Sequence, residues 1–405
     1  MIIVGGTLID GTGADPRSAS ITIDGAHIEA IGTPGRDTDT VDVTGLTVLP
    51  GLIDAHSHFG LVNEFDPDVA PAITAARIFR NCELALDAGF TTVRDTGGID
   101  GGVATAVAKG FIRGPRILPS GPILSQTAGH GDPTGPFHHG HGQSNADIPG
   151  LNQVSIVCDG PDAVRVAART ALKRGATQVK VCVSGGVVSF TDKLEDTQFS
   201  VEELMAAVQE ADARGTYVTA HAHNSKGIQN GLDAGIECFE HGTFLDEATA
   251  RRMAAAGAHL VPTFAVCRLL AQEADAWGIP QELIPKIAPV EAAMAQSLKL
   301  AREHGIVIGL GSDILGPEQD RRGLELLIRA ELEDAMTAIV SATNVNSQVI
   351  RRADELGTLE VGKLADVIAV DGDPLAEPDL FDDPSRIKLV VQGGVIVKDT
   401  RAAGA

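Results

Sequence analysis

The chain has 405 residues, which is enough to bury a sizeable core and to form one large domain together with a smaller one. Hydrophobic residues make up 43% and charged residues 21%, and because both values are ordinary for globular proteins, disorder is not expected. Acidic residues outnumber basic ones by 54 to 32, so the net charge of -22 repels polyanions and argues against nucleic acid as a partner.

Cysteine usage and the N-terminal sequence indicate the compartment. The five cysteines are odd in number and form no CxxC pair, so neither a disulfide framework nor a zinc ribbon is expected. The first residues contain only a short apolar run without a basic region, which argues against a signal peptide, and no stretch approaches the roughly 18 apolar residues of a membrane helix. We therefore expect a cytoplasmic protein without a membrane partner.

Short alternating segments broken by glycine, aspartate and threonine run from residue 1 to about residue 48, which is typical of short strands joined by tight turns. The same pattern of short alternating segments recurs near the C-terminus in GKLADVIAVDGDP and IKLVVQGGVIVKD. Both ends of the chain are therefore predicted to pair in one small sheet domain. The predicted division comprises an N-terminal sheet part (1–50), a central domain (51–353) and a C-terminal sheet part (354–405).

The central region alternates apolar, strand-like runs with helical patterns, as a chain of βα units does. Helical patterns cover 70–88, 161–174 and 201–214, with a glycine just past each end. Eight strand-like runs predict a (β/α)8 TIM-type barrel within the α/β class, whereas the alternative, a doubly wound open sheet, would favour a GxGxxG sequence that the first strand lacks. The runs are LPGLIDAH, FTTVRDTG, PRILPSG, TQVKVCVSGG, TYVTAHAH, IECFEHG, AHLVPTF and IVIGLGSD.

Polar side chains gather at the ends of these runs, where a TIM barrel forms its active site. Residues two apart in a strand share a face, so the first two histidines of the region are expected to converge. Imidazole and carboxylate groups suit a first-row divalent metal such as zinc. One histidine at a strand end is often structural, but six groups in barrel order favour a metal site. They are His56, His58, Lys180, His221, His241 and Asp313.

Lys180 lies among valines in a predicted central strand, where a charged ammonium is costly to bury. One interpretation is that the neutral amine reacts with CO2 to give an anionic carbamate that bridges two metals. The alternative is a buried lysine paired with a nearby carboxylate. The residue types alone leave both interpretations open.

Five motifs in this order resemble the amidohydrolase superfamily of metal-dependent hydrolases: LPGLIDAHSH, VKVCVSGG, VTAHAHN, FEHGT and GLGSD. Their spacing is similar to the branch of imidazolonepropionase-like and Xaa-Pro dipeptidase (prolidase)-like enzymes, to which ochratoxin-degrading amidohydrolases are related. GTLIDGTG near the start and LGTLEVGKLADVIAVDGDP near the end resemble the small β-sandwich domain of the superfamily. The resemblance therefore implies a barrel with a β-sandwich built from both chain ends.

The resemblance also implies two divalent metal ions per chain, with zinc as the first choice, and a homo-oligomeric assembly. In the VTAHAHN motif either histidine could reach the metal, and the family motif favours the first one. One ion would be held by His56, His58 and Asp313, the other by His221 and His241, and the bridge between them would be Lys180 carboxylated by CO2.

The implied chemistry is hydrolysis of a carbon–nitrogen bond. Two metals about 3.5–4 Å apart share a water whose pKa falls toward neutrality, and the resulting hydroxide is the nucleophile. Asp313 is expected to take the proton and return it to the leaving nitrogen. His130 in SQTAGHGD is expected to approach the substrate carbonyl and its oxyanion, since this stretch resembles a histidine-bearing loop of the family; a flexible loop histidine is the alternative. The predicted catalytic residues are thus Asp313, His130 and His241.

Two long segments are expected to border the pocket and to determine specificity. Residues 121–150 are rich in glycine and histidine, and loops of this length tend to be lids or binding loops. Residues 264–300 are predicted to form helices that wall the pocket. An extra metal site in the first segment is less favoured than a solvated histidine-rich loop. The histidines concerned are His138, His139 and His141.

The resemblance favours a small-molecule amide as the substrate, either an N-acyl amino acid or a dipeptide of the Xaa-Pro kind. Alternatives are an aryl carbamate, a phenylurea, an ochratoxin-like mycotoxin amide or a cyclic amide. A substrate carboxylate needs a cation nearby, and the predicted contacts are His223, Lys226 and Arg268. Competing hypotheses are a deaminase-like relative with one metal and no carboxylated lysine, and a relative that uses the barrel without catalysis.

Overall fold

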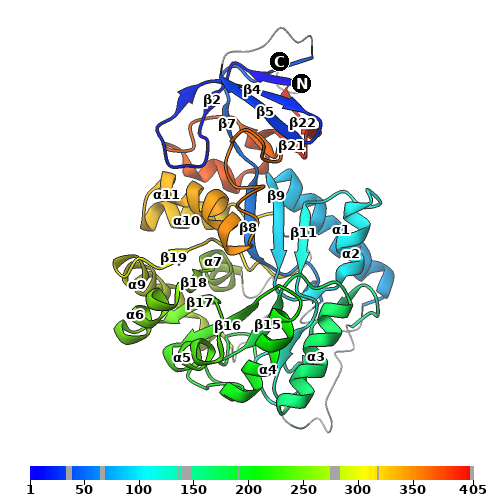
Figure 1. Ribbon diagram of the computed structural model, residues 1–405, viewed down its shortest axis with the longest axis vertical. Helices are drawn as coiled ribbons and strands as arrows, with labels where there is room; N and C mark the ends of the chain where they lie inside the picture. The colour runs from blue at the N-terminus through cyan, green and yellow to red at the C-terminus, as the bar shows by residue number, and fades with distance from the viewer. Residues whose placement is uncertain are drawn as a thin grey trace.

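The computed structural model describes residues 1–32, 39–63, 69–135, 137, 147–189, 191–273, 283–316 and 319–401. Two regions lie one above the other along the long axis of the molecule (Figure 1). Both ends of the chain contribute to the sheets of the upper region, whereas the lower region contains parallel strands flanked by helices. The predicted extra metal-site residues His138, His139 and His141 lie outside the described residues.

Two sheets form the upper region. Apolar side chains from both sheets, such as Ile3, Ile21 and Val367, share one buried cluster. Because β7 pairs antiparallel with β20, strands from the two ends of the chain share one sheet, while the domain boundaries at residues 50 and 354 stay a prediction. The first sheet has the order β5 (His27–Gly32), β4 (Ser20–Asp24), β1 (Ile2–Val4) and β6 (Thr40–Asp42). The second has the order β22 (Val395–Asp399), β21 (Ile387–Gln392), β20 (Val367–Val370), β7 (Thr47–Pro50), β2 (Thr7–Leu8) and β3 (Arg17–Ser18).

Gly51 separates β7 in the upper region from the first strand of the lower region. A Cβ atom at this position would lie 2.1 Å from Thr91 Oγ1, so no residue larger than glycine fits here without a shift. The predicted run that begins at Leu49 is therefore divided between two sheets. Its first part pairs with β20 in the upper region, and its second part forms β8 (Leu52–Ser57).

The lower region contains two sheets of parallel strands. One has the order β11 (Arg116–Pro119), β9 (Phe90–Asp95) and β8. The other has the order β14 (Ser155–Val157), β12 (Ile123–Ser125), β15 (Val179–Cys182), β16 (Val218–Asn224), β17 (Cys238–Phe244), β18 (His259–Val261) and β19 (Val307–Ile308). A separate two-stranded sheet pairs β10 (Gly98–Ile99) with β13 (Asn152–Gln153). All eight predicted runs thus contribute a strand, and β12 and β14 are additional.

A few backbone hydrogen bonds connect the two parallel sheets. Ala55 N in β8 donates to Leu310 O, just after β19, at 3.0 Å, and Thr177 N, just before β15, donates to Pro119 O in β11 at 2.8 Å. Among the described residues no strand ladder joins the two sheets, so they do not form one continuous ladder. At one junction β19 has only two residues, and at the other β11 ends at Pro119, which has no backbone N–H to donate.

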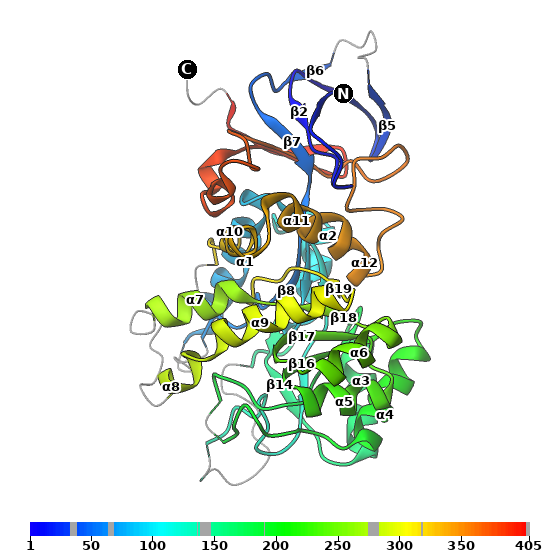
Figure 2. The ribbon, with the colours of Figure 1, turned by 90° about the vertical axis from the view of Figure 1, so that its left-hand side faces the viewer.

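Helices follow most of the parallel strands and cover them, as both ribbon views show (Figures 1 and 2). Local caps explain several boundaries: α4 begins at a capping box of Ser200 and Glu203, and α5 and α6 end at left-handed glycines. The helices are α1 (Pro71–Asp87), α2 (Gly101–Ala108), α3 (Pro161–Lys173), α4 (Val201–Asp212), α5 (Ser225–Ala234), α6 (Glu247–Ala256), α7 (Phe264–Glu273), α8 (Ile284–Ile287), α9 (Val290–Glu303), α10 (Leu324–Leu332), α11 (Ala335–Val340) and α12 (Asn346–Val349).

The two-residue period of the strands sorts side chains between the helices and the pocket. In β15, Val179 and Val181 belong to the apolar cluster shared with the helices, whereas Lys180 lines the pocket. In β16, Ala220 and Ala222 pack outward in the same cluster, and the histidines on either side of Ala222 face the pocket. This alternation places polar groups at the strand ends without interrupting the core.

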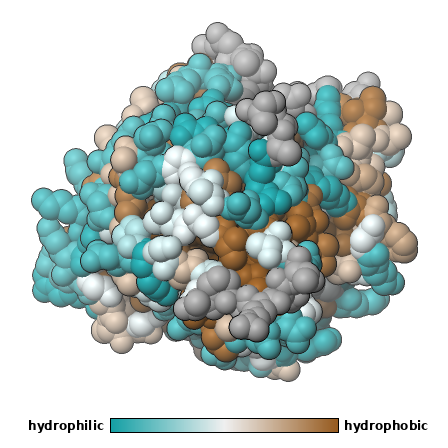
Figure 3. Space-filling view, turned by 90° about the horizontal axis from the view of Figure 1, so that it is seen from above, coloured by the Kyte–Doolittle hydropathy of each residue, from teal (hydrophilic) through white to brown (hydrophobic). Residues whose placement is uncertain are grey.

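Figure 3 views the molecule from above, on the side of the upper region. This face is largely hydrophilic, and hydrophobic residues gather near its middle. Within the described parts of the chain, none of the helices is both long and apolar enough to span a bilayer.

Candidate metal centre

Three ligand-type side chains meet at the end of β8. His56 Nε2 lies 3.1 Å from His58 Nε2, and Asp313 Oδ1 lies 3.3 Å and 3.2 Å from these two nitrogens. The backbone fixes this approach because Asp313 N donates a 2.9 Å hydrogen bond to His56 O. The structure therefore brings together the three residues predicted to hold one metal ion.

The protons on the two imidazoles can be assigned from their other hydrogen bonds. His56 Nδ1 lies 2.7 Å from Glu240 Oε2, and His58 Nδ1 lies 2.8 Å from Gly97 O. A carboxylate or a carbonyl can only accept, so both Nδ1 atoms carry the hydrogen and both Nε2 atoms present lone pairs. With neutral rings, two lone pairs and the Asp313 carboxylate then face one another, an arrangement that a cation stabilises.

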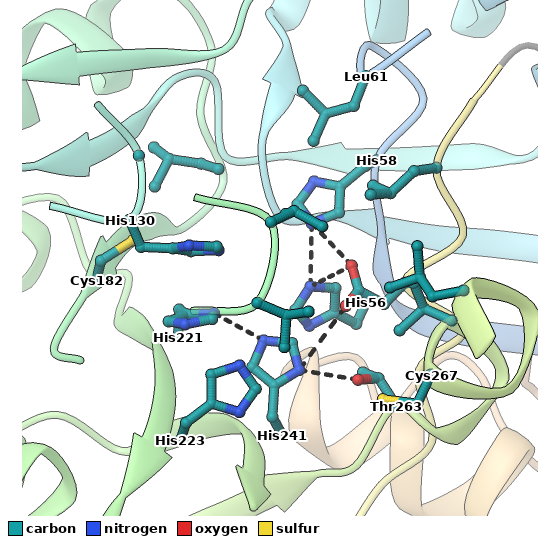
Figure 4. Close-up of a pocket in the computed structure, with 18 of the residues that line it drawn as sticks. His56, His58, Leu61, His130, Cys182, His221, His223, His241, Thr263 and Cys267 are labelled. Atoms are coloured by element: carbon teal, nitrogen blue, oxygen red, sulfur yellow. Dashed lines mark hydrogen bonds and ion pairs between the residues drawn. The ribbon is translucent and has the colours of Figure 1, made fainter. Parts of the chain in front are cut away.

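A second pair of imidazoles lies at the ends of β16 and β17. His221 Nδ1 is 2.9 Å from His241 Nε2, while His221 Nε2 donates to Gly185 O at 3.1 Å and His241 Nδ1 is 2.8 Å from Thr263 Oγ1. His221 Nδ1 therefore presents a lone pair to His241. Figure 4 shows this pair beside the first group of ligands.

His223 belongs to the same cluster. Ligand atoms of His221, His223 and His241 all lie within 4.8 Å of one another, as do those of His56, His241 and Asp313. His223 Nδ1 is 2.7 Å from Thr243 Oγ1, and its ring stacks on that of His241 with centroids 5.0 Å apart. Which histidine of the AHAH sequence would serve as ligand stays a prediction in favour of His221.

The spacing of these atoms suits a divalent metal. Two nitrogens about 2.0–2.1 Å from one tetrahedral zinc lie about 3.3 Å apart. The contacts within the two groups, from 2.9 to 3.3 Å, are close to that value. Burial also lowers the pKa of His221 and His241 well below the usual range, so both rings are neutral, the form in which imidazole binds a metal.

Lys180 lies in the pocket beside these groups with its amine unpaired. The residue is 2% exposed, and its Nζ has no hydrogen-bond partner among the residues that the structure describes. Burial lowers the pKa of the Lys180 ammonium, which favours the neutral amine. The alternative of a buried lysine bonded to a carboxylate is therefore not what the structure shows. An unpaired buried amine calls for a partner that a ligand can supply.

Backbone strain marks two of the six predicted ligands. His241 and Asp313 have φ values of 65° and 54°, in the left-handed region that residues other than glycine rarely adopt. Such strain persists where the surrounding structure fixes a side chain for a purpose, as at ligand clamps and active sites.

A buried ion pair below the first ligand group is a feature that the sequence did not reveal. Glu240 binds His56 through Oε2 and accepts from Arg94 Nη2 through Oε1 at 2.8 Å, and both charged side chains are fully buried. Burial alone would raise the pKa of Glu240, but Arg94 and His56 hold it well below its usual range. A carboxylate behind a ligating histidine fixes the ring and its tautomer. In the sequence, Glu240 is marked only by its position next to His241 in FEHGT.

The predicted substrate contacts differ in where they lie. His130 and His223 line the pocket, and burial lowers their pKa values to about 4 and about 3. Lys226 is exposed on α5, and Arg268 on α7 forms ion pairs with Glu291 at 2.9 Å and with Glu331 at 3.1 Å. Neither Lys226 nor Arg268 belongs to the described lining of the pocket.

The remaining described walls of the pocket are mainly apolar. They come from β12, from the segments after β8, β13, β15 and β19, and from α7 and α9, so residues 264–300 supply a wall as the sequence predicts. Such walls suit an apolar group of a ligand, and the polar groups are concentrated at the cluster of histidines (Figure 4). The apolar side chains are Leu61, Ile123, Val154, Val187, Val188, Val266, Leu270, Val290, Met294 and Leu315.

Comparison with known proteins decides the family. The model of the amidohydrolase family matches residues 47–397, which is most of the chain. The chain belongs to the amidohydrolase family. Ochratoxinase of Aspergillus niger is 34% identical to this amidohydrolase over 418 residues, which cover 98% of this chain and 86% of the relative.

Solved structures agree with this assignment. A prolidase crystallised with N-methylphosphonate-L-proline is 36% identical to this amidohydrolase, with a TM-score of 0.94 over 98% of this chain and 99% of that one. A Xaa-Pro dipeptidase with bound methionine is 31% identical, with a TM-score of 0.88 over 98% and 99% of the two chains. The predicted place in the superfamily, with prolidase-like and ochratoxinase-related enzymes, is confirmed.

Membership of the family fixes the coarse features of this amidohydrolase. It is a hydrolase that acts on carbon–nitrogen bonds, and its fold is that of a TIM-type barrel with a second domain. The family generally uses divalent metals, and the described residues contain a histidine-rich site that could hold them.

Proposed function

We propose that this amidohydrolase cleaves the C–N bond of an N-acyl amino acid or dipeptide at a centre of two divalent ions. The observation that supports this proposal is the convergence of two groups of closely spaced ligand atoms on one apolar-walled pocket, with an unpaired lysine amine beside them. One ion would be held by His56, His58 and Asp313, the other by His221 and His241, and carboxylated Lys180 would join them.

Zinc is the proposed ion because the site offers mainly imidazole nitrogen together with carboxylate oxygen. When bound, a pair of divalent ions supplies a water of lowered pKa and polarises the substrate carbonyl. Lys180 Nζ is suited to bond with the carbon of CO2, because a neutral amine is the form that reacts. The new carbamate gives up one proton and carries a negative charge, and it provides the oxygen ligands that the amine lacks.

Asp313 is the proposed proton carrier. Its Oδ1 faces His56 and His58, and its Oδ2 lies 3.8 Å from His241 Nδ1, so the carboxylate reaches both groups of ligands. A carboxylate in this place can accept a proton from the attacking water and deliver it to the leaving nitrogen, which leaves as an amine. His241 would bind a metal ion and hold the Asp313 carboxylate in its orientation.

The substrate class is supported by the pocket and by the relatives. The apolar walls suit a hydrophobic acyl or amino acid side chain, and the relatives named prolidase, Xaa-Pro dipeptidase and ochratoxinase are enzymes of the same family. Of the three predicted contacts for a substrate carboxylate, only His223 lines the pocket. The alternatives are aryl carbamates, phenylureas, ochratoxin-like amides and cyclic amides. A homo-oligomeric assembly and a cytoplasmic location stay predictions.

A screen of four substrate classes tests the proposed function. Zinc-loaded protein is incubated with N-acyl amino acids, dipeptides that include Xaa-Pro, aryl carbamates and phenylureas, and release of the amine is measured. We expect hydrolysis in the first two classes, with faster turnover for apolar side chains. Asp313→Asn, which keeps the shape of the side chain but removes its charge, controls for contaminating hydrolases. If amine is released from none of the four classes, the proposal is refuted.

A further inference from the structure

The loop after β15 supplies one apolar wall of the pocket. We call the described part of residues 183–199 the β15 loop. Val187 and Val188 of this loop line the pocket. The backbone of Gly186 lies directly against the ring of His130, since a Cβ atom on this glycine would lie 2.2 Å from His130 Cε1. The course of the β15 loop therefore decides where this wall of the pocket lies.

One ammonium group binds the β15 loop at three points. Lys286 Nζ donates to three backbone carbonyl oxygens of the loop, which use all three of its N–H groups. They belong to Gly186, Ser189 and Asp192, at 3.2, 2.7 and 2.8 Å. The side-chain Oδ1 of Asp192 also lies 3.5 Å from Nζ. Carbonyl oxygens that point at one position repel one another, and a cation between them removes this repulsion. Lys286 therefore holds the β15 loop in its present course.

Lys286 belongs to a segment that is anchored in the core. Leu283 and Ile287, which flank it in the sequence, are 3% and 4% exposed and belong to the large apolar cluster of the lower region. Val290 and Met294, which follow on α9, belong to the same cluster and line the pocket. The lysine therefore connects two walls of the pocket, the one formed by the β15 loop and the one formed by α9.

We propose that Lys286 is a positioning residue that determines specificity: by holding the β15 loop, it keeps Val187 and Val188 in contact with the apolar group of a bound substrate. The proposal rests on the function proposed above and deepens it, because it names an apolar wall that selects the substrate and the group that fixes this wall. The alternative is a lysine that only stabilises the fold. Such a lysine would affect stability without altering the preference among substrates.

The effect on the loop can be measured without any substrate. Lys286→Met keeps the length of the side chain but removes its three donors, and Lys299→Met, at an exposed lysine on α9, is the matched control. In zinc-loaded protein, amide hydrogen exchange of peptides that cover residues 183–199 should become at least about tenfold faster in Lys286→Met and stay unchanged in Lys299→Met. Unchanged exchange in Lys286→Met would overturn the proposal.

The consequence for the substrate is measured with N-acetylglycine as the small substrate and with N-acetyl-L-leucine and N-hexanoylglycine as apolar ones. Contact with one methylene group changes a binding equilibrium about fourfold, so the wild type should prefer at least one apolar substrate by roughly that factor or more. In Lys286→Met this preference in kcat/KM should fall roughly three- to tenfold, mainly through a higher KM, because binding rather than chemistry is weakened. A wild type without any preference, or a preference that Lys286→Met leaves unchanged, contradicts the proposal.

An added amine separates loss of the ammonium from general destabilisation. In Lys286→Ala, n-propylammonium has the size of the missing atoms, and the wild-type side chain is 23% exposed, so solvent reaches this site. The ion should restore slow exchange of the loop and part of the preference for the apolar substrate. Tetramethylammonium, which has no N–H to donate, should restore neither. Equal restoration by both ions would mean that hydrogen bonds to the three carbonyls do not hold the loop.

These readouts separate two kinds of failure. If no amide is hydrolysed but exchange becomes faster in Lys286→Met, the proposed function fails while Lys286 still holds the β15 loop. If amides are hydrolysed but neither the exchange nor the preference changes in Lys286→Met, the proposed function stands and the positioning role of Lys286 is wrong.

Discussion

Replacing Lys180 with alanine should lower amide hydrolysis by at least about a thousandfold, because the oxygens of a bridging carbamate would be lost together with their hold on the metals. The bound metal should fall from about two ions per chain to one or fewer. Lys180 is buried with an unpaired amine, so the substitution removes no hydrogen bond among the described residues. Elemental analysis and amine release on the same preparation measure both effects.

Two controls sharpen this test. Lys173→Ala, at an exposed position on α3, removes a lysine elsewhere and should leave activity and metal content unchanged. Adding acetate or propionate to Lys180→Ala should restore part of the activity, since a small carboxylate can occupy the vacated space and supply the missing oxygen ligands. Wild-type turnover and metal content in Lys180→Ala would show that no bridging carbamate is needed.

Glu240→Gln should weaken metal binding by about ten- to a hundredfold, because the carboxylate that holds His56 Nδ1–H would be replaced by a neutral amide. The same change leaves the Arg94 guanidinium buried without its counter-ion, which is expected to cost about 3–5 kcal/mol of folding free energy. Metal titration by calorimetry and thermal unfolding of the metal-free protein measure the two effects separately.

The double variant Glu240→Gln with Arg94→Met distinguishes a metal role from a structural one. Removing both charges of a buried pair is often close to neutral for stability, so the unfolding temperature should recover. Metal affinity should stay low, because His56 still lacks its carboxylate partner. Wild-type affinity in either variant would mean that Glu240 serves only the fold.

The convergence of these polar side chains was predictable from the sequence because it follows from the geometry of strands. A period of two places Lys180 on the pocket face while its valine neighbours pack against helices, and the ends of parallel strands bring His221 and His241 together. The recurrence of polar residues at those ends is visible without any coordinates. The predicted domain boundary between residues 50 and 51 falls inside the first run, and the structure divides this run at Gly51 between two sheets.

Contacts that depend on the faces of helices and loops were not predictable in this way. The positive charge of Lys226 and Arg268 makes them candidates for binding a carboxylate, but Lys226 is exposed to solvent and Arg268 forms ion pairs with two glutamates. Arg94 and Glu240 look like ordinary charged residues within apolar runs, and only the fold shows that they pair. Each of these outcomes depends on a partner distant in sequence.

The surroundings of His130 likewise could not be predicted from the local sequence. SQTAGHGD predicted a histidine near the pocket, and the structure places it there. The position of its ring depends on Ser189, about 60 residues away, whose Oγ lies 3.0 Å from Nδ1, and on the missing Cβ of Gly186, which would lie 2.2 Å from the ring. No local pattern carries that information, because the two segments meet only in the folded chain.

The most direct test of the two-metal account is the metal content of the active wild-type chain. The protein is loaded with zinc, freed of excess ion and analysed for metal per chain, while release of amine from an N-acyl amino acid is followed during stepwise chelation. The account predicts about two ions per chain, with hydrolysis lost as they are removed and regained on their return. Full hydrolysis by a chain that holds one ion or none would contradict it.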